Sequence, residues 1–246
     1  EVVRAYEAYE FHHIYQKVHN FCAIDLSGFY LDVIKDRQYT TQADSVARRS
    51  TQTAMYLIAE ALVRWLAPIL SFTAEEIWLN LPGEREESVF LETWYVLPEM
   101  FLSQEDAEQQ FGMVYWQEVL AVRDAVKKEL EKLRVAGDIG SSLDAEVDLY
   151  CDADWLARLS RLEDELRFVL ITSYARLHPL GEKASEAISV DLDGTRMAIR
   201  VTPSDYGKCV RCWHHREDVG GNVDHPELCG RCVENVDGRG EQRHYA

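Results

Sequence analysis

Two pairs of cysteines near the C-terminal end constrain this chain more than any other feature. Cys209 and Cys212 form one C-x-x-C pair, and Cys229 and Cys232 form a second, with sixteen residues between the pairs. Each C-x-x-C loop brings two thiolates to one side of a tight turn, and two such loops supply the four ligands of a closed zinc site. Gly230 is expected to give the second loop a positive φ at little steric cost. We therefore predict one structural Zn²⁺ on these four cysteines.

The alternative for the same cysteines is a pair of disulfides. Disulfides need an oxidising compartment, and the sequence shows no secretory signal. His214, His215 and His225 could each replace a thiolate, but four cysteines already complete the shell. Cys22 and Cys151 stand alone in apolar patterns and are expected to be buried thiols.

Composition limits the kind of partner that the chain can bind. A hydrophobic content of 47% over 246 residues predicts a folded protein, and no apolar run approaches a membrane span. The net charge of −17 argues against a broad basic surface for nucleic acid, so any RNA binding must use local patches and stacking. Because the chain begins at Glu1 within helix-like sequence, we expect a fragment of a longer protein. We also expect this protein to be cytoplasmic and monomeric.

The first 137 residues have helical periodicity. Phe11, Ile14, Val18 and Phe21 recur at helical spacing, before a polar turn expected at Ser27-Gly28. A long helix is expected over residues 43–66, because Pro68 should end it.

Two further helices are expected in this region. Thr73 and Glu76 have the spacing of a capping box, which predicts a short helix beginning at Thr73. A second long helix is predicted over residues 105–136, with Gly137 as the residue that terminates it.

After Gly137 the pattern changes to that of a small α/β module. Residues 145–151 alternate apolar and polar side chains, as in a half-buried strand, and residues 155–166 are helical in period. Residues 168–171 form an apolar, strand-like run. Residues 188–192 and 197–201 flank Asp193-Gly194, a pair typical of a two-residue hairpin turn. We predict a mainly α protein with a helical domain (1–137), a small α/β junction module (138–204) and a zinc-finger module (205–246).

Four segments carry a resemblance to a known family. They are FYLDVIKDRQYT (29–40), ALVRWLAPILSFTAEEIW (61–78), IGSSLDAEV (139–147) and CVRCWHH with ELCGRCVENV (209–236). In this order they resemble the C-terminal region of bacterial isoleucyl-tRNA synthetases over nearly the whole chain. The first two are similar to the anticodon-binding helical domain shared by the isoleucine, valine and leucine enzymes, and the last resembles the zinc finger of the bacterial isoleucine enzyme.

The resemblance implies a parent enzyme that activates isoleucine with ATP and Mg²⁺ and then esterifies it to tRNA. The family's His-Ile-Gly-His and Lys-Met-Ser-Lys-Ser type sequences do not occur here, and His12-His13-Ile14-Tyr15 is not the former. The resemblance therefore implies a fragment that holds the anticodon stem-loop of tRNA(Ile), while a catalytic core elsewhere in the polypeptide performs the chemistry. We identify no catalytic residue in this chain.

Candidate RNA contacts follow from the chemistry of unstacked bases, which proteins recognise by stacking and by edge hydrogen bonds. Trp213 directly follows a cysteine loop and could be a stacking platform, or could instead pack against the loop to exclude water. The candidate cations lie beside the cysteines or in the predicted helical domain; they are Lys208, Arg211, Arg231, Lys35, Arg37, Arg48 and Arg49. Alternatively, those beside the cysteines balance the charge of a zinc–thiolate site, and those in the helical domain lie on a solvent-exposed helix face.

Two other functions remain open from the sequence. Formamidopyrimidine-DNA glycosylases end in a similar four-cysteine finger, but that family needs a catalytic N-terminal proline and this chain begins with Glu1. The zinc module could also be purely structural and brace the preceding α/β module.

Overall fold

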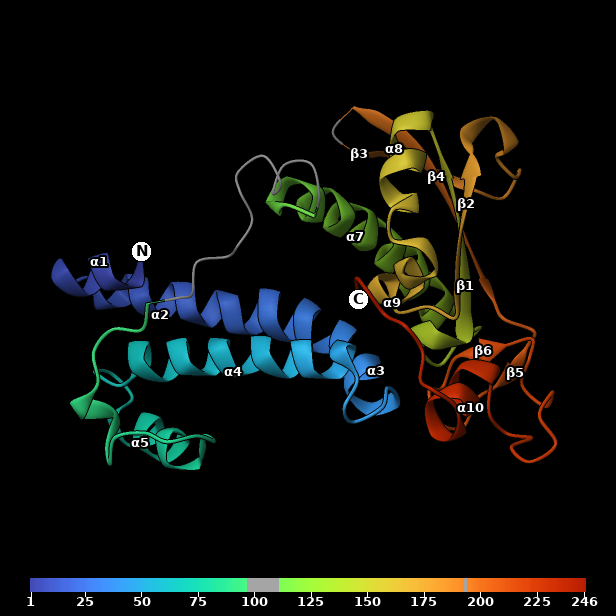
Figure 1. Ribbon diagram of the computed structural model, residues 1–246. Coiled ribbons are helices and arrows are strands. Elements are labelled where there is room, and N and C mark those ends of the chain that lie inside the picture. Colours follow the sequence, from blue (N-terminus) through green and yellow to red (C-terminus); the bar gives the residue numbers. More distant parts are fainter. Residues whose placement is uncertain (97–110, 193) are drawn as a thin grey trace. The chain divides into compact units, whose positions relative to one another are not determined.

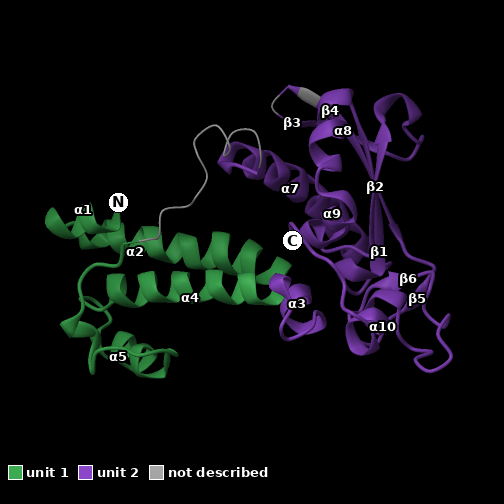
Figure 2. Cartoon of the chain, viewed as in Figure 1, with its two compact units in different colours: residues 1–34, 48–101 green, residues 35–47, 102–246 purple. Residues whose placement is uncertain are grey.

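The computed structural model describes residues 1–96, 111–192 and 194–246. The chain divides into two compact units (Figure 2). The first contains residues 1–34 and 48–101, and the second contains residues 35–47 and 102–246. In its coarse form the fold class is as predicted, since the chain is mainly helical with a small sheet and a four-cysteine cluster. Among the described residues, no helix combines the length and apolar character needed to cross a membrane.

The first unit is helical (Figure 1). Its elements are α1 (Val2–Glu7), α2 (Phe11–Asn20), the π-helical segment η1 (Phe21–Tyr30), the start of α3 (Leu31–Thr40), most of α4 (Val46–Leu66), α5 (Ser71–Asn80) and the short 3₁₀ turn η2 (Val89–Leu91). The polar turn predicted at Ser27-Gly28 is wrong, because η1 continues the helix through it. A Ser-Gly pair weakens a helix by only about 1–1.5 kcal/mol, and the wider π turn accommodates it without a break.

The α4–α5 connection confirms one prediction and corrects another. α4 ends at Leu66, just before Pro68, as predicted. The capping box predicted from Thr73 is wrong: α5 begins at Ser71, and the carbonyl of Leu70 accepts the first helical hydrogen bond, from Ala74, at 2.8 Å. Glu75, the neighbour of Glu76 in the predicted box, accepts hydrogen bonds from the Ser88 hydroxyl and the Val89 amide, both at 3.0 Å. It therefore fastens the chain after α5 rather than capping the helix.

A buried ion-pair cluster surrounds Trp78, which is 1% exposed. The guanidinium groups of Arg64 and Arg85 lie 4.8 and 4.3 Å from the Trp78 ring. Glu60 pairs with both arginines, at 3.0 Å to Arg85. Burial raises the pKa of Glu60, but the hydrogen bonds from Arg64 and Arg85 outweigh it and hold the pKa below its ordinary value.

The second unit begins with residues 35–47, which are the end of α3, the following turn and the start of α4. Its later elements are α7 (Met113–Ala136), η3 (Ser142–Asp144), β1 (Ala145–Cys151), α8 (Ala153–Ser160), η4 (Glu163–Glu165), α9 (Leu166–Leu170), β2 (Tyr174–Pro179), η5 (Leu180–Glu182), β3 (Ile188–Leu192), β4 (Thr195–Pro203), β5 (Gly207–Lys208), β6 (His215–Arg216) and α10 (Gly230–Asp237). α7 ends at Gly137 with φ of +83°, as predicted, while its predicted start at residue 105 lies outside the described residues.

The main sheet has the strand order β2-β1-β4-β3 (Figure 1). β1 and β2 are parallel, joined through α8 and α9, and β4 runs antiparallel to β1 and β3. α7, α8 and α9 pack on the sheet. The predicted hairpin of β3 and β4 is confirmed, with Leu192 opposite Thr195; Asp193 of its turn lies outside the described residues.

Two predictions for this module are wrong. The strand β1 is buried on both faces rather than half-buried, because its polar residues also have partners: Glu146 lies 2.7 Å from Arg176 and Asp148 lies 2.8 Å from His178. The strand-like run 168–171 is mostly the short helix α9. Phe168, Val169 and Leu170 are all buried in α9, so a single turn of helix shows the same short apolar run as a buried strand.

Candidate metal centre and nucleic-acid interface

The four predicted zinc ligands meet at one point. Cys209 directly follows β5, Cys212 lies in the loop to β6, and Cys229 and Cys232 lie at the start of α10. All four are buried, and their Sγ atoms lie within 4.8 Å of one another. Cys212 and Cys229 have Sγ atoms 3.7 Å apart, far beyond a disulfide bond of about 2.05 Å.

This arrangement fits Zn²⁺. Four thiolates at about 2.3 Å from a tetrahedral zinc ion lie about 3.8 Å from one another, close to the spacing seen here. Among the described residues, these cysteines are the one cluster of three or more potential metal-ligating side chains. Two of the three nearby histidines have other partners: His215 contacts the Tyr206 carbonyl at 2.7 Å, and His225 pairs with Asp237 at 2.5 Å. The site therefore matches a closed, structural zinc site with four sulfur ligands.

Gly230 serves a different purpose from the one predicted. Its φ is not positive; instead, its amide donates to Asp218 Oδ2 at 2.9 Å. A Cβ at this position would lie 2.8 Å from the same oxygen. The glycine is thus needed for the close approach of Asp218, which holds the loop between the two cysteine pairs.

The positive φ of the cysteine loops belongs to Trp213, at +66°. Its amide donates to the Cys209 carbonyl at 2.9 Å, and the Cys209 amide donates to the His214 carbonyl at 2.9 Å, which closes the loop. A residue with a side chain is disfavoured in this conformation by about 1–2 kcal/mol, and glycine is not. The Trp213 side chain gains little burial in return, because the residue is 62% exposed. Most of the Trp213 ring therefore faces solvent, and only the smaller part of it packs against the protein.

The candidate Arg231, in contrast, is used inside the protein. Its Nη1 and Nη2 atoms bind Asp36 Oδ2 and Oδ1 at 2.6 and 2.7 Å, and Nη1 also binds Glu241 at 3.1 Å. Arg243 Nη1 binds the same Asp36 carboxylate at 2.7 Å. Burial raises the pKa of Asp36, but Arg231 and Arg243 outweigh it and hold the pKa well below its ordinary value. Asp36 is therefore ionised at neutral pH.

Two other candidate arginines also have partners within the second unit. Arg211 Nη1 donates to the Thr40 carbonyl at 2.6 Å. Arg37 is 8% exposed and lies 4.0 Å from Glu165. Glu165 also accepts hydrogen bonds from the backbone amides of residues 244–246, at 2.6 to 2.8 Å.

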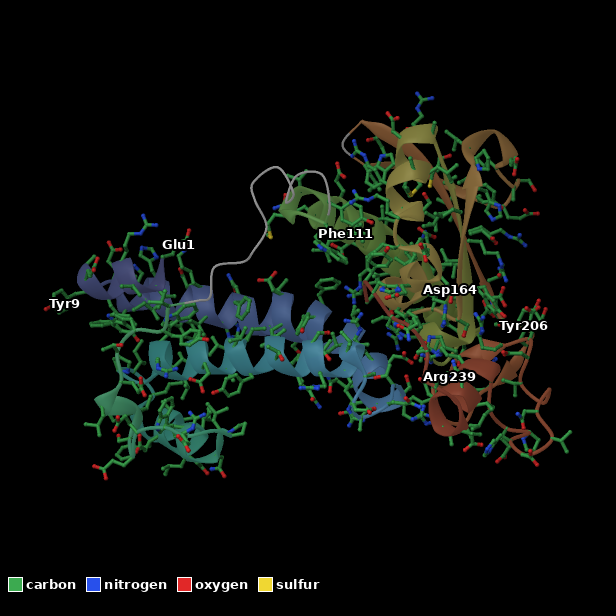
Figure 3. All side chains as sticks on the ribbon, in the orientation of Figure 1. Glu1, Tyr9, Phe111, Asp164, Tyr206 and Arg239 are labelled. Carbon is green, nitrogen blue, oxygen red and sulfur yellow. The ribbon has the colours of Figure 1, made fainter. Side chains whose placement is uncertain are left out.

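The remaining candidate cations reach the surface to different degrees. Lys208 is exposed and pairs with Asp144 at 3.1 Å. Lys35 is exposed on α3, and on α4 Arg49 is exposed while Arg48 is half-buried. Tyr206 (Figure 3), directly before β5, lies 5.7 Å from the Tyr174 ring and adds a partly exposed aromatic side chain to the zinc module. The structure thus brings Lys35 and Trp213 into one compact unit, whereas Arg48 and Arg49 belong to the other.

Asp36, Glu165 and Arg243 are important residues that sequence reasoning missed. Each lies in a polar stretch that is indistinguishable from a solvated helix face or tail. Their burial depends on contacts between residues about 80 to 200 positions apart, which local periodicity does not reveal.

Comparison with known proteins decides the family. The model for the anticodon-binding domain of tRNA ligases matches residues 1–149. The chain belongs to this family. A second family, described as a zinc finger found in FPG and IleRS, matches residues 207–235, which include all four cysteines. The DNA-repair alternative is not favoured, because it accounts for the zinc finger but not for the anticodon-binding domain.

Similar proteins include three named isoleucine–tRNA ligase. Those of Nitrosococcus oceani, Thioalkalivibrio sulfidiphilus and Alkalilimnicola ehrlichii are 62%, 61% and 60% identical over 247 aligned positions, which cover 100% of this chain. The chain spans 26% of the length of each of these relatives. The resemblance inferred from the four motifs is therefore confirmed over the whole chain.

Proposed function

We propose that this chain recognises the anticodon stem-loop of tRNA(Ile) as the C-terminal part of an isoleucine–tRNA ligase. Support comes from the anticodon-binding family of residues 1–149 and from relatives named isoleucine–tRNA ligase that match the whole chain. In this proposal the remaining polypeptide activates isoleucine with ATP and Mg²⁺ and transfers it to tRNA. This part holds the substrate and performs no bond-making step.

The proposed zinc ion is structural. Cys209, Cys212, Cys229 and Cys232 would fill its shell, so no position would remain for water or substrate. The ion would fix the two cysteine loops, and with them the backbone that carries Trp213.

The observation that carries the proposal is the conformation and exposure of Trp213. A strained backbone held by the surrounding fold, with a large aromatic ring facing solvent, is characteristic of a functional position. An anticodon loop presents unstacked bases, and an exposed indole can stack on one of them with about 1–3 kcal/mol of binding free energy. We therefore assign Trp213 as a base-stacking residue.

The cations have two roles in this proposal. Lys208 and Lys35 in the second unit, and Arg48 and Arg49 in the first, are proposed to contact phosphates. Arg211, Arg231 and Arg37 have partners inside the second unit, which supports a role in shaping the RNA-binding surface rather than in binding RNA directly.

We further propose the functional division into an anticodon-binding helical domain (1–137), a junction module (138–204) and a zinc-finger module (205–246). The protein is proposed to act as a monomer in the cytoplasm, with its catalytic core and tRNA as partners.

Binding to matched tRNAs tests the proposal. The affinity of the zinc-loaded chain, and of the full-length protein, is measured for tRNA(Ile) and for the same tRNA with its anticodon changed. We expect weaker binding after the anticodon change, and affinity that falls with added salt. We also expect aminoacylation by the full-length protein and none by this chain. Equal affinity for both tRNAs, or aminoacylation by this chain alone, would refute the proposal.

A further inference from the structure

The Asp36 carboxylate is the meeting point of the zinc module and the segment 35–47. It accepts two hydrogen bonds from Arg231 and one from Arg243, at 2.6 to 2.7 Å. The side chains of Asp36, Arg231 and Arg243 are 13%, 13% and 1% exposed. Glu241 completes the cluster, 3.1 Å from Arg231 and 3.8 Å from Arg243. The charges of two arginines and two carboxylates therefore compensate one another in a cluster that is largely shielded from solvent.

Both cysteine loops are tied to this one segment. Arg211, between the first two cysteines, donates to the Thr40 carbonyl at 2.6 Å, one helical turn beyond Asp36. Arg231, between the second two, binds Asp36 itself and lies 3.3 Å from the Thr40 hydroxyl. Gln42 adds a hydrogen bond to the Gly238 carbonyl at 3.0 Å. The turn after α3 is thus fastened to both halves of the metal site.

These contacts lie on either side of Trp213. Arg211 is two residues before it, and His214 directly follows it. His214 is 2% exposed, packs edge-on against Phe168 at 5.5 Å between ring centroids, and has Nδ1 4.0 Å from Asp36 Oδ1. With these flanking residues anchored, the backbone that carries the exposed indole is held to the segment 35–47.

We infer that Asp36 is a positioning residue for RNA recognition, acting through Trp213 without touching RNA. Its charge gathers Arg231 and Arg243, which holds the zinc module against the segment 35–47, so that Trp213 and the exposed Lys35 form one RNA-binding surface. This inference rests on the proposed function. The buried Asp36 carboxylate would then determine the geometry of an RNA-binding surface that Asp36 itself does not reach.

A double-mutant cycle in the full-length protein tests the inference. The variants are Asp36→Asn, Trp213→Ala and their combination, with Asp44→Asn as the control because Asp44 is an exposed carboxylate in the same segment. We expect Asp36→Asn to raise the Kd for tRNA(Ile) by about three- to thirtyfold. We expect Asp44→Asn to leave the Kd for tRNA(Ile) unchanged. Both variants should keep the zinc content and the tRNA-independent rate of isoleucine activation of the unmodified protein.

The decisive readout is the combined variant. If Asp36 acts through Trp213, the combined variant binds tRNA no more weakly than Trp213→Ala alone. Additive losses, or full affinity in Asp36→Asn, would overturn the inference. Unchanged affinity in Trp213→Ala would instead refute the proposed stacking role. If Asp36→Asn fails to retain zinc, Asp36→Glu replaces it in the cycle, since it keeps the charge and shifts it by one methylene group; the same two outcomes then decide.

Discussion

Replacing Trp213 with glycine and, separately, with alanine distinguishes the contributions of its backbone strain, its packing and its RNA binding. The backbone of Trp213 has φ of +66°, which glycine adopts freely and alanine does not. Both substitutions remove the same ring. The difference between them in free energy of unfolding therefore reports the strain, and the loss of RNA affinity that they share reports the ring.

The magnitudes follow from the structure. Because Trp213 is 62% exposed, only about 90 Å² of the roughly 250 Å² that a tryptophan can bury is out of water, worth about 2 kcal/mol. Glycine recovers about 1–2 kcal/mol of strain. Part of this gain is offset by the greater freedom of glycine in the unfolded chain, worth about 0.5–1 kcal/mol. We expect Trp213→Gly to lower the free energy of unfolding by about 0.5–2 kcal/mol, and Trp213→Ala, which keeps the strain, by about 2 kcal/mol.

The assays are chemical denaturation of the zinc-loaded chain and titration with a fluorescently labelled anticodon stem-loop. Both variants should lose about 1–3 kcal/mol of binding free energy, which is about five- to 150-fold in Kd. Two results would refute the reasoning. Alanine more stable than glycine would show that the left-handed conformation does not constrain the loop, and unchanged Kd in both variants would show that the exposed ring does not stack on RNA.

Three further predictions concern the rest of the chain. Cys229→Ser should abolish stoichiometric zinc binding, and residues after 205 should become sensitive to proteolysis while the first unit stays folded. Retention of one equivalent of zinc would contradict this prediction. Glu60→Gln should lower the free energy of unfolding of the first unit by about 1–3 kcal/mol at pH 7. Because the folded pKa of Glu60 is lowered, this difference should be complete above about pH 4.3 and vanish as the pH falls through the folded pKa. Gly230→Ala should displace Asp218 and lower the free energy of unfolding of the zinc module by about 1 kcal/mol, measured by calorimetry. An unchanged melting curve would show that Asp218 does not hold the loop.

The sequence predicted those features that local chemistry determines. The four cysteines meet because C-x-x-C spacing by itself brings thiolates together, and Pro68 and Gly137 end helices because of their own backbone limits. The hairpin of β3 and β4 likewise follows from strong alternation on both sides of a short turn.

Other features depend on contacts between distant residues and were missed or wrong. The carboxylates of β1 are buried because β2 supplies Arg176 and His178, which no property of residues 145–151 indicates. The ion pair of Arg231 with Asp36 joins residues 195 positions apart, so the sequence around Arg231 does not indicate it. A positive φ is expected at Gly230 because glycine adopts it most readily, yet the fold imposes it on Trp213.

The most direct test of the account is the footprint of an isoleucine anticodon stem-loop on the zinc-loaded full-length protein, measured by hydrogen exchange at peptide resolution. We predict slower exchange in residues 35–47 and 208–216 on binding, no change in β3, and loss of the protection in residues 208–216 when the anticodon bases are replaced. Protection that avoids residues 208–216, or that is the same for an unrelated anticodon, would contradict the claim that the metal-fixed loop reads the anticodon.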